Sequence, residues 1–505
     1  MRAPPSLAVF ALAAGCALGL VACKSGTSQP KSAVWFGPGS APNQGNVAAA
    51  AGPGQFAAAA AMQEPRVGHT ATVLPDGRVL VVGGRTADPF NDPNNITPES
   101  ELYDPVADTW TQVSQLAANQ GQNPNPGYMW DATNSVQTRR QEHAAVVLQT
   151  GTVLITGGCG TDAPAPLPGS AFGALKSAYL FEPATNGFVK AQDMGEARYF
   201  HLASLMTNGK AIVVGGVNSI AGNPLPANQT SVLRTAETFD PVNGWTPVTA
   251  PMNDGHTWGN IHQLGNDTLV SNGVFIDAVA PQGAQVQGAT VRGIQTGMVW
   301  PGGSTNGQFA AQNGEIFNPT AAQPQFAPGP TTQREVPPSG IILSGSAALS
   351  SGDIFFAGGE NLGPQRNTKD AGALFTTEIL RLQSRTFDPG PDIGSSQPPV
   401  TLPSGQTAPA PPFPVTEVEC EEVGFTSNVL LVGGVAPNGQ SVPFAEFWDY
   451  VNNFMIGPPI QMAQARHGHR LAKLSGNRIL VIGGLGVPPG GQQEAPLNSC
   501  EIWSR

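Results

Sequence analysis

Residues 78–84 read Arg-Val-Leu-Val-Val-Gly-Gly, and this short apolar run ending in Gly-Gly returns along the whole chain. Further copies end at Gly157-Gly158, Gly215-Gly216, Gly358-Gly359, Gly433-Gly434 and Gly483-Gly484, and a degenerate copy ends at Asn272-Gly273. Each run has the length and the aliphatic or β-branched character of a buried strand. A residue suited to a tight turn precedes the first Gly position of each copy by six, which predicts a hairpin with an earlier strand: Gly77, Gly151, Gly209, Asn266, Gly352, Ser427 and Asn477.

The earlier strand carries fixed residues of its own. A histidine lies 14 residues before the first glycine in four units, at His69, His143, His201 and His469, and an arginine lies three residues before each of them, at Arg66, Arg140, Arg198 and Arg466. In the weaker units the histidine position holds Trp258, Ser344 and Glu419. Residues that recur in register around a repeat are expected to serve the scaffold, for example by hydrogen bonding between units.

A third and a fourth element follow each run. The third is mostly Glu-x-aromatic, at Glu101–Tyr103, Tyr179–Phe181, Glu237–Phe239, Glu315–Phe317, Glu378–Leu380, Glu446–Trp448 and Glu501–Trp503. The fourth opens with an aromatic residue six to nine positions later, at Trp110, Phe188, Trp245, Phe326, Phe387 and Phe454. The seven recurrent Glu/Tyr positions are again better explained as scaffold than as paired catalytic acids, which must face one bond.

The seventh unit has no fourth element after Trp503, and a matching one stands near the N-terminus. Phe56 precedes Met62 by six residues, as Phe188 precedes Met194. Residues around 54–62 are therefore predicted to be the missing strand, which pairs with the last unit and closes the repeats into a ring without an open sheet edge.

A four-stranded unit with Gly-Gly, Tyr/Phe-Asp-Pro-like and Trp landmarks resembles the kelch repeat. The resemblance covers nearly all of residues 54–505 and implies an all-β fold, a seven-bladed β-propeller of four-stranded antiparallel blades. The units are longer than the usual 50 residues, and the excess falls in Pro-, Gly- and Asn-rich insertions, at about 113–138, 159–176, 217–232, 274–313 and 388–415.

Composition agrees with strands joined by turns. Only 12% of the residues are charged, while the chain has 62 Gly and 48 Pro. The formal net charge of −11 argues against a nucleic-acid partner, which would attract Lys and Arg.

The N-terminus has the features of an export signal. Arg2 supplies a positive charge, Leu7–Ala22 is apolar but short for a membrane span, and the stretch ends Leu20-Val21-Ala22-Cys23. This ending resembles the lipobox of bacterial lipoproteins, which implies cleavage before Cys23 and acylation of its sulfur and amino group. We therefore expect a signal peptide at 1–22, a flexible tether at 23–53 and the propeller at 54–505. Because Lys24 follows Cys23, the expected location is the outer membrane of a bacterial cell envelope; an ordinary secretory signal is the alternative.

Three further cysteines follow Cys23 in the mature chain, namely Cys159, Cys420 and Cys500. Two of them could pair in an oxidising compartment, and the sequence leaves this open. No C-x-x-C spacing indicates zinc. His467 and His469 would share one face of a strand, where metal ligation is conceivable, but His469 is a repeat position, so the sequence predicts no metal and no cofactor.

Catalytic motifs give no support for an enzyme. The chain has no G-x-S-x-G, H-E-x-x-H or Walker A pattern. Its resemblance to kelch proteins leaves two enzyme alternatives: a galactose oxidase-like copper radical oxidase, which would need two Tyr, two His and a Tyr–Cys cross-link, and a periplasmic sugar mutarotase. The function favoured by the sequence is a non-catalytic binding protein that holds a protein or polysaccharide ligand on its long loops.

Overall fold

The computed structural model describes residues 54–87, 92–114, 128–131, 136–161, 173–218, 233–252, 255–271, 313–321, 324–331, 341–342, 344–361, 374–394, 400–401, 407–408, 415–424, 428–436 and 440–505. Regular structure in these residues is almost entirely β-strand, with one 3-10 turn, η1 (Pro93–Asn95). The predicted all-β class is confirmed. In this part of the chain no helix is both long and apolar enough to cross a membrane.

Each recurring unit of the sequence forms one antiparallel sheet, and the sheets are numbered here in the order of their first strands. Sheet 1 is β2 (Thr70–Val73), β3 (Val79–Val82), β4 (Ser100–Asp104) and β5 (Thr109–Gln112); sheet 2 is β9 (Ala144–Val147), β10 (Val153–Thr156), β13 (Ala178–Glu182) and β14 (Gly187–Lys190). Sheet 3 is β15 (Leu202–Leu205), β16 (Ala211–Val214), β17 (Ala236–Asp240) and β18 (Gly244–Pro247); sheet 4 is β19 (Asn260–Leu264), β20 (Asp267–Ser271), β21 (Asn313–Phe317) and β22 (Phe326–Thr331). Sheet 5 is β24 (Gly345–Ala348), β25 (Ile354–Ala357), β27 (Thr377–Leu380) and β28 (Phe387–Pro389). Sheet 6 is β31 (Glu419–Glu422), β32 (Asn428–Val432), β33 (Phe444–Asp449) and β34 (Phe454–Met455), with β35 (Ile460–Gln461) also on β33. Sheet 7 is β36 (Arg470–Leu474), β37 (Arg478–Ile482), β40 (Cys500–Ser504) and β1 (Gln55–Ala59).

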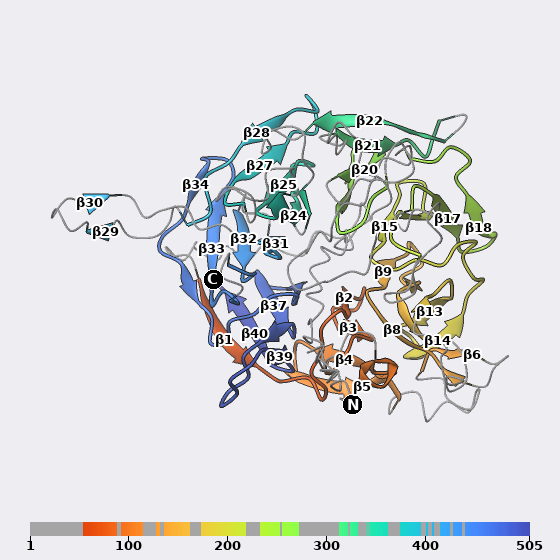
Figure 1. The fold of residues 1–505 in the computed structure, drawn as a ribbon, viewed down its shortest axis with the longest axis horizontal. Helices are drawn as coiled ribbons and strands as arrows, with labels where there is room; N and C mark the ends of the chain where they lie inside the picture. Colours follow the sequence, from red (N-terminus) through yellow and green to blue (C-terminus); the bar gives the residue numbers. More distant parts are fainter. Residues whose placement is uncertain are drawn as a thin grey trace, which may run out of the picture.

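The sheets follow one another around a ring (Figure 1). The first strands contact each other in the order β2, β9, β15, β19, β24, β31 and β36, and β36 contacts β2 again. An apolar cluster of buried side chains fills the gap between each two neighbouring sheets. The second strand of most sheets is buried along its whole length, because it packs against a neighbour on both faces.

The ring is closed by the two ends of the described chain. β1 pairs antiparallel with β40, and Phe56 lies opposite Trp503. Both residues belong to the apolar cluster between sheets 6 and 7. The strand predicted near residues 54–62 therefore occupies the fourth position of the last sheet, beside a strand about 440 residues away in sequence.

The two ends of the ring differ. Within each sheet, short turns join strands one to two and three to four, and these define the turn end, as Val73↔Val79 and Asp104↔Thr109 do in sheet 1. Two other kinds of connection lie at the opposite end, which we call the loop end. One joins strand two to strand three, and the other joins strand four to the next sheet. All the long insertions predicted from the sequence belong to these connections. Short paired strands occur within them: β6 (Trp130–Asp131) with β7 (Val136–Gln137), β11 (Cys159–Thr161) with β8 (Arg139–Gln141) and β12 (Gly173–Ala174), β23 (Ile341–Ile342) with β26 (Glu360–Asn361), β29 (Val400–Thr401) with β30 (Thr407–Ala408), and β38 (Leu485–Gly486) with β39 (Ala495–Pro496).

The Gly-Gly pairs lie at the loop end, where two sheets approach closely. A side chain on Gly83 would place its Cβ 2.2 Å from the carbonyl oxygen of Arg140 in the next sheet. Gly84 then donates its N–H to that same carbonyl at 2.9 Å. Both glycines have positive φ, of 58° and 91°. Glycine is required here for both steric and conformational reasons.

The aromatic landmarks meet across strands three and four. Tyr103 faces Trp110 with ring centroids 5.0 Å apart, and the same pairing recurs at Phe181–Phe188, Phe239–Trp245 and Phe317–Phe326. In sheet 6 Phe454 opens the fourth strand as predicted, but it pairs with Asp449 and is half exposed, and Met455 lies opposite Trp448.

Truncation tests the closing strand. Deleting residues 24–50 leaves β1 intact and should leave the thermal midpoint unchanged. Deleting 24–63 removes β1, exposes Trp503 and opens sheet 7, so we expect a loss of several kcal/mol of unfolding free energy. Thermal unfolding of the two truncations with the same buffer and tag decides the matter, and equal midpoints would contradict the assignment.

Candidate functional site

The recurrent arginines hold the scaffold at the loop end. Each guanidinium donates to the carbonyl oxygen of the first glycine of its own sheet, at 2.7–2.9 Å. In sheets 1, 3 and 7 it also pairs with the buried glutamate of the third strand, as Arg66 does with Glu101 at 2.9 Å. Breaking such a buried pair from one side costs about 3–5 kcal/mol. The prediction of structural pairing is confirmed.

Besides pairing with the arginine, the glutamate of the third strand accepts hydrogen bonds from the backbone. Glu101 accepts the backbone N–H groups of Gln63 and Glu64, and Glu237 and Glu501 accept two backbone N–H groups each in the same way. The carboxylate therefore ties the incoming chain to its own sheet. In sheet 2 Tyr179 replaces the glutamate, and Arg140 lies over its ring, 5.0 Å from the centroid.

The recurrent histidines bridge neighbouring sheets. Thr70 of sheet 1 lies 2.9 Å from Nε2 of His143, and Thr156 of sheet 2 lies 2.8 Å from Nε2 of His201. The rings are fully buried and pack against the first glycine of the preceding sheet. Hydrogen bonding between units, which the sequence predicted, is confirmed for these two.

In two of the weaker units the sequence placed the histidine position one residue away from where the structure has it. In each regular unit the histidine directly precedes the first paired residue of the inner strand, and Gly259 and Val418 hold that place in sheets 4 and 6, not Trp258 and Glu419. The cause is the length of the hairpin between strands one and two. In sheet 4 this hairpin is short and turns through Gly265 and Asn266 alone, with a positive φ at Gly265. In sheet 6 it has one residue more than in sheet 1. Ser344 was placed correctly, and Ser427 lies outside the described residues.

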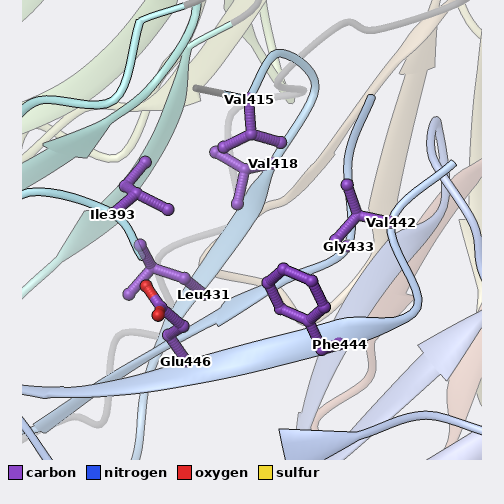
Figure 2. Close-up of a pocket in the computed structure, with 8 residues that line it drawn as sticks. All are labelled: Ile393, Val415, Val418, Leu431, Gly433, Val442, Phe444 and Glu446. Atoms are coloured by element: carbon purple, nitrogen blue, oxygen red, sulfur yellow. The ribbon is translucent and has the colours of Figure 1, made fainter. Parts of the chain in front are cut away.

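Sheet 6 departs from the arginine pattern and holds a small apolar cavity (Figure 2). Val415 stands where sheets 1, 2, 3 and 7 have arginine, since Gly359 donates to its carbonyl as Gly84 does to that of Arg140. Phe444 stands where the arginine sheets have residues such as Ser177, Thr235 and Ser499. Figure 2 shows Phe444 and Glu446 projecting from β33 towards Val415 and Val418. The cavity of about 10 Å³ would hold about one water, so little space is left between Val415 and Phe444.

A row of left-handed residues precedes the inner strands. Glu142, Phe200, Trp258 and Glu417 have φ of 52–57°, at the position that Gly68 and Gly468 hold in sheets 1 and 7. Such a conformation costs a non-glycine residue about 1–2 kcal/mol. It aims the N–H of Glu142 at the carbonyl of Gly68 and that of Phe200 at the carbonyl of Glu142. The row joins sheet to sheet, and the sequence analysis missed it, although these residues directly precede the histidine position.

Once the recurrent residues are assigned to the scaffold, a non-recurrent polar group remains at the loop end. It consists of Glu417, Ser441, His467 and Glu494, and we call it the loop-end cluster. Its members come from four different connections of sheets 6 and 7. At the position of His467 the other described units have Val67, Gln141, Tyr199, Thr257 and Thr416, so repetition does not explain it.

The geometry of the loop-end cluster fixes its hydrogen bonding. Ser441 donates to the Glu494 carboxylate at 2.6 Å, because a carboxylate can only accept, and Nδ1 of His467 lies 2.8 Å from the same hydroxyl. Nδ1 must therefore donate to Ser441. Nε2 faces the Glu417 carboxylate at 4.0 Å, and both Glu417 and His467 are buried. Ser441 and Glu494 are partly exposed. The cluster can present a hydroxyl and a carboxylate, held by a buried imidazole, to a ligand at the surface.

The cluster does not have the features of a metal site. His469, the other candidate from the sequence, is turned towards Gly433 in sheet 6, because the left-handed Gly468 separates it from His467. In the part of the chain that the structure describes, no three His, Cys, Asp or Glu side chains are arranged to hold an ion. Cys159, Cys420 and Cys500 are buried, and no disulfide joins any two of them in the described structure, which answers the open disulfide question.

The copper ligands of a radical oxidase do not fit the described side chains. The hydroxyls of Tyr103, Tyr128 and Tyr450 donate to the carboxylates of Asp108, Glu99 and Glu422. Tyr179 lies between the cations of Arg140 and Lys190, each 5.0 Å from its ring centroid, which is unsuitable for a metal ligand. Only Tyr199 remains where two tyrosines are needed.

The buried histidines predict a loss of stability in acid. Burial, and after it the charge of nearby arginines, holds the pKa of His69, His143 and His201 well below the ordinary 6.5. The unfolded chain takes up these protons below about pH 6.5 and the folded chain does not, so stability is complete above that pH and falls below it. When the thermal midpoint is measured between about pH 8 and 5, His143→Gln should reduce the slope of the midpoint against pH. Thr70→Val, the control, should lower the midpoint equally at every pH; an unchanged slope in His143→Gln would contradict the explanation.

Sheet 6 has Val415 and Phe444 where an arginine and a serine stand in sheets such as sheet 7, and substitutions can restore those two residues. Phe444→Ser alone should cost about 3–5 kcal/mol through the cavity it leaves, and Val415→Arg alone should also destabilise, because Phe444 occupies the space. The double variant should recover at least about 1 kcal/mol over the sum of the single effects, since the new guanidinium reaches Glu446. Urea unfolding of the four proteins gives this coupling, and additive effects would show that the two positions are independent.

Comparison with known proteins gives a fold and no family. No family model matches the chain, and no curated protein matches it. Among solved structures, a fungal alcohol oxidase of the AA5 family in complex with copper superposes with a TM-score of 0.53 at 12% identity, over 89% of this chain and 76% of that one. YjhT superposes with a TM-score of 0.48 at 14% identity, over 78% of this chain and 98% of that one. The likeness to the oxidase, with the ring of four-stranded sheets, identifies the fold as a β-propeller.

Proposed function

We propose that this chain is a seven-bladed β-propeller lipoprotein of the bacterial cell envelope, which binds a protein or polysaccharide ligand at its loop end without catalysing a reaction. Each of the seven sheets is one blade in this proposal, and Cys23 carries the lipid. The anchor is expected in the outer membrane.

The observation that carries the proposal is the difference between the two ends of the ring. Every long insertion belongs to a connection of the loop end, whereas the turn end has only short turns. Variable loops gathered on one side of a rigid β scaffold are the usual arrangement of a recognition surface. Seven neighbouring sheets with separate apolar clusters supply the rigidity.

The loop-end cluster supplies polar groups for such a surface. Ser441 and Glu494 are partly exposed and fixed by His467. A fixed hydroxyl and carboxylate suit hydrogen bonding to sugar hydroxyls or to peptide N–H groups, and pre-organisation lowers the entropy lost on binding. The fold itself does not choose between a binding protein and an oxidase. The binding function is favoured because the described tyrosines and histidines do not form a copper site.

Binding can be tested on glycan arrays and against peptidoglycan and outer-membrane protein fractions, with the mature chain as probe. Each loop-end insertion is replaced in turn by a short Gly-Ser linker, and Glu494→Gln is made separately. We expect at least one loop replacement to lower affinity more than about tenfold while the thermal midpoint stays within about 3 °C.

Lys replacements of Val106 and Val242, two exposed residues of the turn end, serve as matched controls and should bind normally. Binding that is lost in these controls but kept in all loop replacements would contradict the proposal. So would copper-dependent peroxide formation by the purified protein.

A further inference from the structure

The described chain starts at the turn end of the ring. Gln55, the first residue of β1, lies opposite Ser504, and Ser504 lies opposite Arg478, next to the turn between β36 and β37. β1 then runs towards the loop end and continues into the connection that leads to sheet 1. A tether that joins Cys23 to Gly54 is therefore attached to the turn end.

The turn end also carries most of the exposed apolar side chains of the described residues. Val106, Val242 and Val451 are 95%, 90% and 66% exposed, at equivalent turns between strands three and four of sheets 1, 3 and 6. Phe454, which starts the fourth strand of sheet 6, is 49% exposed. An aspartate before each valine accepts the N–H groups of the turn and so fixes the valine at the tip.

We infer that the turn end rests on the lipid bilayer that holds the anchor, with Val106, Val242, Val451 and Phe454 as its contacts, and that the loop end faces away from the membrane. This rests on the proposed lipid attachment at Cys23. We assign the bilayer surface as the partner of these exposed apolar side chains, because the segment proposed to reach a membrane joins the ring on this same side.

The length of the tether supports this orientation. The sequence predicts a flexible tether at residues 23–53, and a flexible chain of this length has a root-mean-square span of about 30 Å. A domain of this size has a radius of gyration of about 22 Å. The turn end is thus held within about one radius of the bilayer, and the exposed valines would be the first side chains to meet it.

Fluorescent labels on single cysteines can measure the orientation. The lipoprotein is placed in vesicles of phosphatidylethanolamine and phosphatidylglycerol with a polarity-sensitive dye at Val106→Cys, Val242→Cys or Val451→Cys. Labels at Phe375→Cys and Val487→Cys, which are exposed at the loop end, are the matched controls. Cys159, Cys420 and Cys500 are buried, and the unsubstituted protein should take up no dye.

We expect nitroxide lipids to quench the turn-end labels at least twofold more than the loop-end labels, and aqueous iodide to quench them less. A triple variant with Val106→Asp, Val242→Asp and Val451→Asp should fold normally, because these side chains are exposed. In this variant a label at Phe454→Cys should be quenched by nitroxide lipids no more than the loop-end labels are. Equal quenching at both ends, or stronger quenching at the loop end, overturns the inference.

The inference and the proposed lipidation fail separately. Intact-mass measurement of the native protein and of Cys23→Ala reports acylation directly. A chain with a hexahistidine tag in place of Cys23, held on nickel-chelating lipids, is attached at the same point without acylation. Turn-end quenching in this sample with no acyl mass in the native protein would refute the lipid anchor and support the orientation. Acylation with equal quenching would support the anchor and refute the orientation.

Discussion

The whole ring depends on a close backbone contact at the Gly-Gly pairs. The second glycine donates its N–H to a carbonyl of the next sheet at Gly84, Gly158, Gly216, Gly359, Gly434 and Gly484. The first glycine lies so near that carbonyl that no side chain fits. Because this contact fixes each sheet against the next, the arginine, the glutamate and the histidine can take the same places in successive sheets.

The repeated interactions explain why the conspicuous charged residues are not the site. Arg66, Arg198 and Arg466 are buried and paired with glutamates of their own sheets. The pairing tolerates the exchange of one partner, as in sheet 2, where Tyr179 replaces the glutamate beneath Arg140. In sheet 4 His256 faces Glu315, and in sheet 6 Val415, packed with Phe444, replaces the arginine. Such compensated exchange is typical of a packed scaffold. Function is therefore sought in residues that no other sheet repeats.

The sequence predicted the features that recur as residue types and failed on those that do not. The strands, the Gly-Gly positions and the closing strand near residues 54–62 followed from the spacing of the landmarks. Trp258 and Glu419 were misplaced because a hairpin one residue shorter or longer shifts the inner strand without any change in composition. The loop-end cluster could not be predicted, since Glu417, Ser441, His467 and Glu494 come together only through the packing of two sheets.

The pairing of β1 with β40 has a consequence for how the protein is made. Residues 55 and 504 must meet before the last sheet is complete, so the ring cannot close until residues 500–504 have been synthesised. Contacts of such long sequence separation form slowly, because the entropy of closing a large loop is lost first. The ring thus stays open while the chain is being made, and the pairing of β1 with β40 is among its last folding steps.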